Sequence, residues 1–118
     1  AGGLVISPFD SAMRSLIVAI FELGVNEIMV VAHSECGACH MHYDAFHAHM
    51  KARGIADSTL ETIRRSGINL NEWLEGFHDT EASVRHTVDV IQHHPLVPHD
   101  VSVRGFIINS VTGELTAV

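Results

Sequence analysis

The chain has 118 residues, of which 47% are hydrophobic, and it carries a formal net charge of −7 at pH 7. This length and apolar content predict one small globular domain with its own core. The acidic balance, without a cluster of Lys and Arg, argues against a partner held through phosphates, so we expect no nucleic-acid ligand and a small molecule instead.

The beginning of the chain and its apolar runs bear on localisation. Ala1, Gly2 and Gly3 open the sequence with no initiator Met and no signal stretch, so we interpret this as an internal start with an N-terminal part missing upstream. The most apolar stretch, residues 16–31, is interrupted by Glu22 and is too short to cross a bilayer, which needs roughly 18 to 20 residues. We therefore expect a soluble, cytoplasmic protein without a membrane partner.

The first predicted elements are a helix and a strand. Asp10 or Ser11 is the expected N-cap of an amphipathic helix that Gly24 closes. The apolar, β-branched run of residues 27–32 follows. Because this run does not alternate with polar residues, we expect a strand buried on both faces, as in a parallel sheet under helices. Helix, tight turn and buried strand together indicate an α/β fold.

Two further helices are predicted in the middle of the chain. Residues 38–53 form one, with histidines and charged residues on its solvent-exposed face, and Gly54 ends it. Residues 58–65 form a shorter one, for which Asp57 or Ser58 is the expected cap.

The next segment has a weaker periodicity. In residues 69–77, Trp73 and Phe77 lie four positions apart and are the expected core anchors. Asp79 or Thr80 then begins a helix with an apolar face.

The last third of the chain predicts two strands around a turn. Residues 101–108 form the second strand, and Gly113 is free to take a positive φ in the turn that follows. Residues 115–118 return as an edge strand. We expect a single domain over residues 1–118, with a mainly parallel sheet flanked by helices.

The candidate metal-binding residues lie between the end of the first predicted strand and the next predicted helix. His33 and Cys36 lie three apart there, and Gly37 follows them. Open α/β sheets bind ligands outside the carboxyl ends of their strands. An imidazole and a thiolate in one tight turn suit tetrahedral zinc, so we predict His33 and Cys36 as metal ligands.

A zinc site needs at least one more protein ligand, and the sequence leaves its identity open. Cys39 forms a C-x-x-C with Cys36, and His40 and His42 are nearby alternatives. We favour the interpretation of Cys39 as a helix residue packed against its neighbours. Most of the ten histidines are expected to be surface residues, some of which could relay protons.

Several segments carry a recognisable pattern. They are, in order, Ala1-Gly2-Gly3, Met13-Arg14-Ser15-Leu16, Leu23-Gly24-Val25, His33-Ser34-Glu35-Cys36-Gly37, Arg53-Gly54-Ile55, His93-His94-Pro95-Leu96 and Arg104-Gly105-Phe106. Together they resemble the small bacterial β-class carbonic anhydrases over essentially all 118 residues.

The resemblance implies an enzyme that reversibly hydrates carbon dioxide to bicarbonate and a proton. It also implies zinc held by one His and two Cys, with His33 and Cys36 as two of the three. Ala1, Gly2 and Gly3 would line the substrate pocket. The other Cys belongs to a Cys-x-Asp-x-Arg motif that this sequence lacks, which fits the expected missing N-terminal part. A homodimer or a higher homo-oligomer is the implied assembly.

Three other interpretations remain. The same scaffold could hydrolyse carbonyl sulfide or carbon disulfide with the same metal. A non-catalytic zinc or redox module could use Cys36 and Cys39 as a dithiol. His33 and Cys36 could also be packed residues in a family member without metal.

Overall fold

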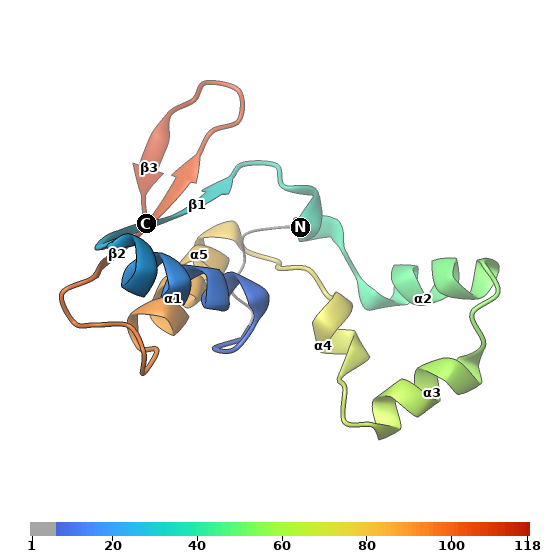
Figure 1. Cartoon of the computed structure of the whole chain (residues 1–118). Helices are drawn as coiled ribbons and strands as arrows, with labels where there is room; N and C mark the ends of the chain where they lie inside the picture. The colour runs from blue at the N-terminus through green and yellow to red at the C-terminus, as the bar shows by residue number, and fades with distance from the viewer. Residues whose placement is uncertain (1–6) are drawn as a thin grey trace. The chain divides into compact units, whose positions relative to one another are not determined.

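The structure is a computed structural model that describes residues 7–118, so the predicted pocket residues Ala1, Gly2 and Gly3 lie outside the described part. Helices and strands follow one another along the chain as shown in Figure 1. They are α1 (Ser11–Leu23), β1 (Glu27–His33), the 3-10 helix η1 (Gly37–His40), α2 (Tyr43–Ala52), α3 (Asp57–Arg65), α4 (Leu70–Leu74), α5 (Thr80–Gln92), β2 (Ser102–Ile108) and β3 (Leu115–Ala117).

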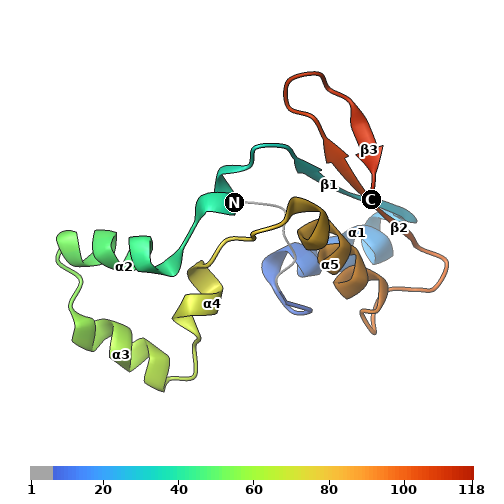
Figure 2. The ribbon, with the colours of Figure 1, turned by 180° about the vertical axis from the view of Figure 1, so that it is seen from behind.

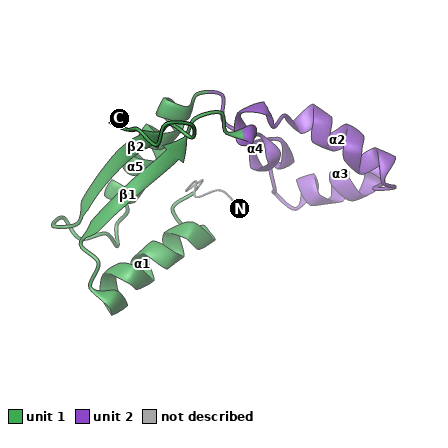
Figure 3. Cartoon of the chain, turned by 90° about the horizontal axis from the view of Figure 1, so that it is seen from above, with its two compact units in different colours: residues 1–36, 79–118 green, residues 37–78 purple. Residues whose placement is uncertain are grey.

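The chain divides into two compact units, which Figure 3 colours separately. One unit consists of residues up to 36 together with 79–118 and contains all three strands; we call it the sheet unit. The other consists of residues 37–78, and we call it the helical unit. The prediction that residues 1–118 form one domain stays a prediction.

The sheet unit confirms the predicted α/β fold. Its three strands are ordered β1-β2-β3, with β1 and β2 parallel and β2 and β3 antiparallel (Figure 2). The parallel register runs from Glu27 beside Ser102 to His33 beside Ile108. The carboxyl ends of β1 and β2 therefore meet at the same edge of the sheet.

The ends of α1 follow the predicted capping signals. The Asp10 side chain accepts a hydrogen bond from the backbone N–H of Met13 at 2.8 Å, so Asp10 rather than Ser11 is the N-cap. Gly24 follows the helix with φ of 71°, a conformation that a glycine adopts without steric cost. Local chemistry thus fixes both ends of the helix.

Helix α5 packs directly on the sheet, and Gly105 in β2 makes the close approach possible. A Cβ at this position would lie 2.6 Å from Cγ1 of Val84 and 3.2 Å from Cγ2 of Val88, both in α5. The helix begins at the predicted cap, where the Asp79 side chain accepts from the N–H of Ala82 at 2.9 Å.

The predicted burial of β1 on both faces is wrong for the described chain. Ile28 is buried in the main core, whereas Met29 and Val31 are 50% and 48% exposed. Successive side chains of a strand point to opposite faces, and the helices of the sheet unit cover the face that carries Ile28. That core is built from Met13, Ile20, Ile28, Ile91 and Val97.

In the helical unit, the single helix predicted for residues 38–53 is also wrong. The 3-10 helix η1 ends at His40, and α2 begins only at Tyr43. Between them His42 is extended, with φ of −122° and ψ of 138°. The carbonyl of Met41 accepts a hydrogen bond from Gly76 at 2.8 Å, so it bonds to a distant segment instead of continuing a helix.

The predicted caps of α3 are wrong as well, because Asp57 is its first residue and Ala56 stands at the N-cap without a side-chain bond. The Asp57 carboxylate instead accepts from Lys51 Nζ at 3.0 Å and lies 3.2 Å from His47 Nε2, both in α2. The Lys51 hydrogen bond first, and the His47 contact second, lower the pKa of Asp57.

Trp73 does not anchor the helical unit, since it is 63% exposed, and Phe77 is only half-buried. The core here is formed by Tyr43, Leu60 and Leu70, which are buried. Leu74, one turn after Leu70, packs against this cluster, so the inner face of α4 leaves Trp73 outside. None of the helices within residues 7–118 has the length and apolar character that crossing a bilayer requires.

Candidate metal centre

A sharp turn follows β1 and carries both predicted ligands. His33 is the last residue of the strand, and Cys36 follows three positions later. Glu35 between them has φ of 54°, the left-handed region that few residues other than glycine adopt. This conformation reverses the chain within two residues of each predicted ligand.

The turn is tied to the loop between β2 and β3. The N–H of Ser34 donates to the carbonyl of Ile108 at 3.0 Å, which extends the parallel pairing by one bond. The hydroxyl oxygen of Ser34 accepts from the N–H of Ser110 at 3.0 Å, and the two hydroxyls are also 3.0 Å apart. The Ser34 side chain, next to His33, is therefore held by hydrogen bonds from the loop that follows β2.

His33 presents a ring nitrogen that can bind a metal. Its Nδ1 lies 3.0 Å from the carbonyl oxygen of Ser34, and in the tautomer with the proton on Nδ1 it donates to that oxygen. This leaves Nε2 as the free acceptor, the arrangement common in metal-binding histidines. His33 is exposed and Cys36 half-buried, and Cys36 is a thiol outside any disulfide. An imidazole and a thiol at a strand end fit zinc chemistry.

No third ligand joins this pair within residues 7–118, because no third His, Cys, Asp or Glu side chain groups with His33 and Cys36 there. Cys39 and His40, two of the sequence candidates, belong to η1 in the helical unit. The assignment of His33 and Cys36 as metal ligands stays a prediction.

His94 is a structural residue. It is buried, its Nε2 donates to the carbonyl of Pro8 at 2.7 Å, and its Nδ1 accepts from the N–H of Leu96 at 3.1 Å. Both ring nitrogens thus bond to the backbone, which leaves neither for a metal. This histidine holds the segment before α1 against the segment after α5.

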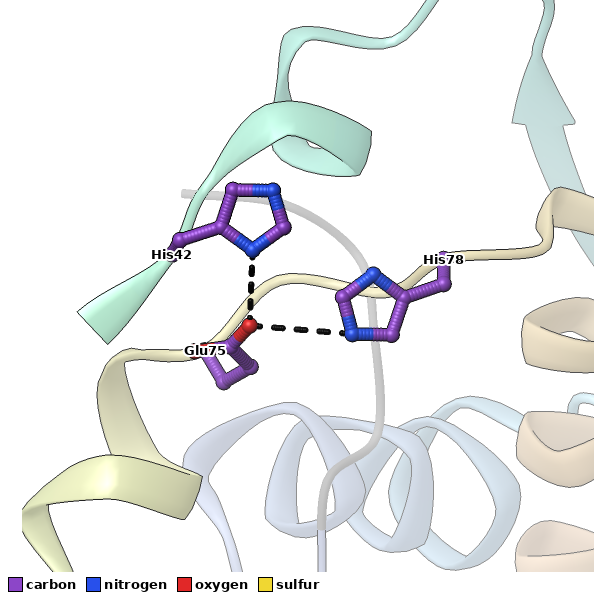
Figure 4. Close-up of side chains that lie close together, drawn as sticks. All are labelled: His42, Glu75 and His78. Carbon is purple, nitrogen blue, oxygen red and sulfur yellow. Dashed lines mark hydrogen bonds and ion pairs between the residues drawn. The ribbon is translucent and has the colours of Figure 1, made fainter. Parts of the chain in front are cut away.

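His42, the remaining sequence candidate, lies beside Glu75 and His78 in the helical unit (Figure 4). The N–H of Tyr43 donates to Oε2 of Glu75 at 2.8 Å, and that bond, followed by the contact with His42, lowers the pKa of Glu75. No sequence pattern indicated Glu75 or His78. His42 and Glu75 are 33 positions apart and no periodicity connects them.

The family model described as carbonic anhydrase matches residues 1–115. The Bacillus subtilis protein YtiB, provisionally named a carbonic anhydrase, is 43% identical over 118 residues, which are 100% of this chain and 63% of that protein. Beta-carbonic anhydrase 1 of Mycobacterium tuberculosis is 31% identical over 109 residues, 92% of this chain and 60% of that protein. The chain therefore spans less than two thirds of the length of these relatives.

Among solved structures, the β-carbonic anhydrase isoform I of Trichomonas vaginalis superposes with a TM-score of 0.83 at 30% identity, covering 97% of this chain and 62% of that one. The chain belongs to the β-carbonic anhydrase family. This membership confirms the resemblance read from the sequence.

Proposed function

We propose that this protein catalyses the reversible hydration of carbon dioxide to bicarbonate and a proton, with zinc held in part by His33 and Cys36. The observation that carries the proposal is the placement of an available imidazole and a thiol on one sharp turn at the carboxyl end of a parallel strand. Membership of the carbonic anhydrase family and the names of the relatives support the same reaction.

The residues of the turn would hold the metal and fix its ligands. Nε2 of His33 and the thiolate of Cys36 are the proposed donors, and the bond between His33 Nδ1 and the Ser34 carbonyl sets the ring orientation. The contact between Ser34 and Ser110 ties this turn to the loop between β2 and β3. Zinc, when bound, supplies a Lewis acid that lowers the pKa of water from about 15.7 towards 7.

The rest of the site is proposed to come from outside residues 7–118. Zinc sites with an open position have three protein ligands, so one further donor must join His33 and Cys36. Ala1, Gly2 and Gly3 are proposed to line the pocket for the uncharged gas, since small residues permit a close approach of the backbone. We further propose a cytoplasmic homodimer or higher homo-oligomer.

A second candidate reaction is the hydrolysis of carbon disulfide or carbonyl sulfide. It is favoured by the carbon disulfide hydrolase of Acidithiobacillus thiooxidans, which is 28% identical over 121 residues, covering 98% of this chain and 59% of that enzyme. The names of the more similar relatives favour carbon dioxide. Assaying both gases with one preparation distinguishes the two reactions.

The test uses as its parent the protein that includes the further donor, and compares His33→Ala and Cys36→Ala with two matched controls. His86→Ala removes an exposed histidine of the same unit, and Cys39→Ala removes the other thiol. Each ligand variant should lose about one zinc per chain and its carbon dioxide hydration, and the controls should keep both. Hydration that survives in either ligand variant, or a parent that never holds zinc at His33 and Cys36, would overturn the proposal.

A further inference from the structure

The helical unit brings three ligand-type side chains together from its two ends. His42 lies just before α2, Glu75 follows α4 directly, and His78 is the last residue of the unit. Figure 4 shows both imidazoles turned towards the carboxylate of Glu75. Within residues 7–118 this is the one group of three or more such residues whose ligand atoms lie within 4.8 Å of one another.

The spacing of the three donor atoms is close to that of a metal site. Oε1 of Glu75 lies 2.9 Å from His42 Nδ1 and 3.6 Å from His78 Nε2. Zinc binds nitrogen and carboxylate oxygen at about 2.0 to 2.2 Å, so tetrahedral ligands are about 3.3 to 3.6 Å apart. The first distance is shorter than this range and the second lies at its upper end. The ligand atoms of the three residues all lie within 4.8 Å of one another. Two ligand atoms at that upper limit would have to approach each other by about 1.4 Å to bind one zinc ion, which exposed imidazoles accomplish by small rotations.

The backbone holds these groups in place independently of any ion. The N–H of Gly76 donates to the carbonyl of Met41 at 2.8 Å, beside the ligand positions on both segments. A Cβ on Gly76 would lie 1.8 Å from the carbonyl oxygen of Ala38, so only a glycine permits this approach. The segments that carry His42 and Glu75 are therefore fixed side by side by the main chain.

The orientation of the carboxylate adds a second, independent constraint. Oε2 of Glu75 accepts the N–H of Tyr43, the first residue of α2, at 2.8 Å. This bond occupies the oxygen that faces the helix and leaves Oε1 towards the two imidazoles. The rings of His42 and His78 are stacked, with centroids 5.5 Å apart and an angle of 17° between planes. Both rings thus approach the same oxygen from neighbouring directions.

We propose that His42 Nδ1, Glu75 Oε1 and His78 Nε2 bind a divalent transition metal ion of the zinc type, at a site separate from His33 and Cys36. Two imidazoles and one carboxylate form a recognised three-ligand zinc set with room for water. Because its ligands come from both ends of the helical unit, the ion fastens residue 42 to residues 75 and 78. We call the site formed by His42, Glu75 and His78 the clasp, because its ion would hold together the two ends of the segment that contains α2, α3 and α4. The clasp does not depend on the proposed carbon dioxide chemistry.

The two proposed sites differ in donor chemistry, and this difference makes them separable in one protein. The site at His33 and Cys36 includes a thiolate, whereas the clasp has only nitrogen and oxygen donors. Cobalt(II) bound to a thiolate has a sulfur-to-metal charge-transfer absorption that a site of nitrogen and oxygen lacks. Cobalt(II) can therefore be used as the probe for both sites.

The experiment titrates cobalt(II), and then zinc, into the metal-free 118-residue chain carrying Cys36→Ala, which removes the thiolate site. This protein should still bind one ion per chain without a charge-transfer band. Adding His42→Ala or His78→Ala should weaken that binding at least about tenfold, since even residues that only support a metal ligand change affinity by about 10- to 100-fold.

Two further variants guard against misinterpretation. His49→Ala removes an exposed histidine of α2 outside the cluster and should leave the affinity unchanged. Glu75→Gln keeps an oxygen for the N–H of Tyr43, so it should preserve the fold, shown by circular dichroism, while weakening the binding of the metal.

Hydrogen exchange gives a further measurement. Zinc should slow exchange in α2 and α4 of the parent and not of the His78→Ala chain. Unchanged affinity in His42→Ala and His78→Ala, or an equal loss in His49→Ala, would overturn the clasp.

Discussion

The sheet unit and the helical unit are stabilised in different ways. The sheet unit has an apolar core in which Met13 and Ile91 are each only 1% exposed. The helical unit has three buried residues and relies more on polar contacts, among them the bonds of Asp57 and Glu75 to neighbouring segments. Apolar burial contributes to stability in proportion to area, whereas exposed ion pairs contribute little.

The two units should therefore respond to different perturbations. Removing apolar volume should affect the sheet unit most, because its core has the most neighbours to lose. Changes in backbone fit, charge and metal should affect the helical unit most, since its segments meet through polar groups.

The largest effect is expected from cavities in the two cores. Ile91→Ala in the sheet unit and Leu60→Ala in the helical unit remove buried aliphatic side chains that are 1% and 3% exposed. Such substitutions cost roughly 2 to 5 kcal/mol of unfolding free energy. We expect Ile91→Ala towards the upper end and Leu60→Ala towards the lower end, because the smaller cluster can collapse around its cavity. Urea unfolding measures both.

Two exposed aliphatic residues serve as controls for these cavities. Val111 in the sheet unit is 85% exposed and Ile68 in the helical unit is 49% exposed, so their alanine variants should change stability by less than about 0.5 kcal/mol. If Leu60→Ala costs more than Ile91→Ala, the contrast between the two units is wrong.

An intermediate effect is expected from a methyl group added at Gly76. The Cβ of Gly76→Ala would lie 1.8 Å from the carbonyl oxygen of Ala38, and a backbone atom cannot move aside as a side chain can. We expect a loss of about 1 to 3 kcal/mol, measured by faster hydrogen exchange in α2 and α4. Gly37→Ala, whose Cβ would meet nothing within 4 Å, is the matched control. Equal exchange in both variants would contradict the close approach.

The smallest effect is expected from Asp57. Its pKa is lowered in the folded state by Lys51 and then His47, so the ionised carboxylate contributes stability above its ordinary pKa and loses it as the pH falls through the folded value. Asp57→Asn should therefore melt slightly below the parent at pH 7, and the difference should close as the pH falls below about 4. Melting temperatures at low and high salt measure this, because salt screens exposed pairs. The ion pair would be excluded as the cause if the difference in melting temperature between Asp57→Asn and the parent persisted in acid. It would also be excluded if Asp100→Asn showed the same difference.

The elements of the sheet unit were predictable because their signals are local. Asp10 and Gly24 mark the ends of α1 through chemistry within one turn, and Asp79 does the same for α5. The β-branched residues of β1 identified the strand, although they did not show that Met29 and Val31 would be half exposed. Burial on the second face depends on what covers it, which periodicity does not encode.

The helical unit was predicted less well because its decisive contacts are not local. The helix predicted for residues 38–53 is interrupted at His42, where the carbonyl of Met41 accepts the N–H of Gly76. No spacing in the sequence predicts that bond. Trp73 was expected in the core by residue type alone, whereas the orientation of the short helix α4 decided its exposure. The proposed ligands His33 and Cys36 could be predicted because they share one motif, and their role as ligands stays a prediction. Glu75 and His78 were missed because they join His42 only in three dimensions.

The parallel pairing of β1 with β2 has a consequence for the order in which the protein can form. Ser34 and Ser110, which lock the sheet edge, are 76 positions apart, and the helical unit lies wholly between them. On the ribosome, β1 therefore emerges long before its partner strand exists and cannot pair until residue 108 has been added. Closing so long a loop is entropically costly and makes non-local pairing slow. Throughout that interval β1 cannot make its parallel pairing with β2, and an unpaired strand edge is a site where chains aggregate.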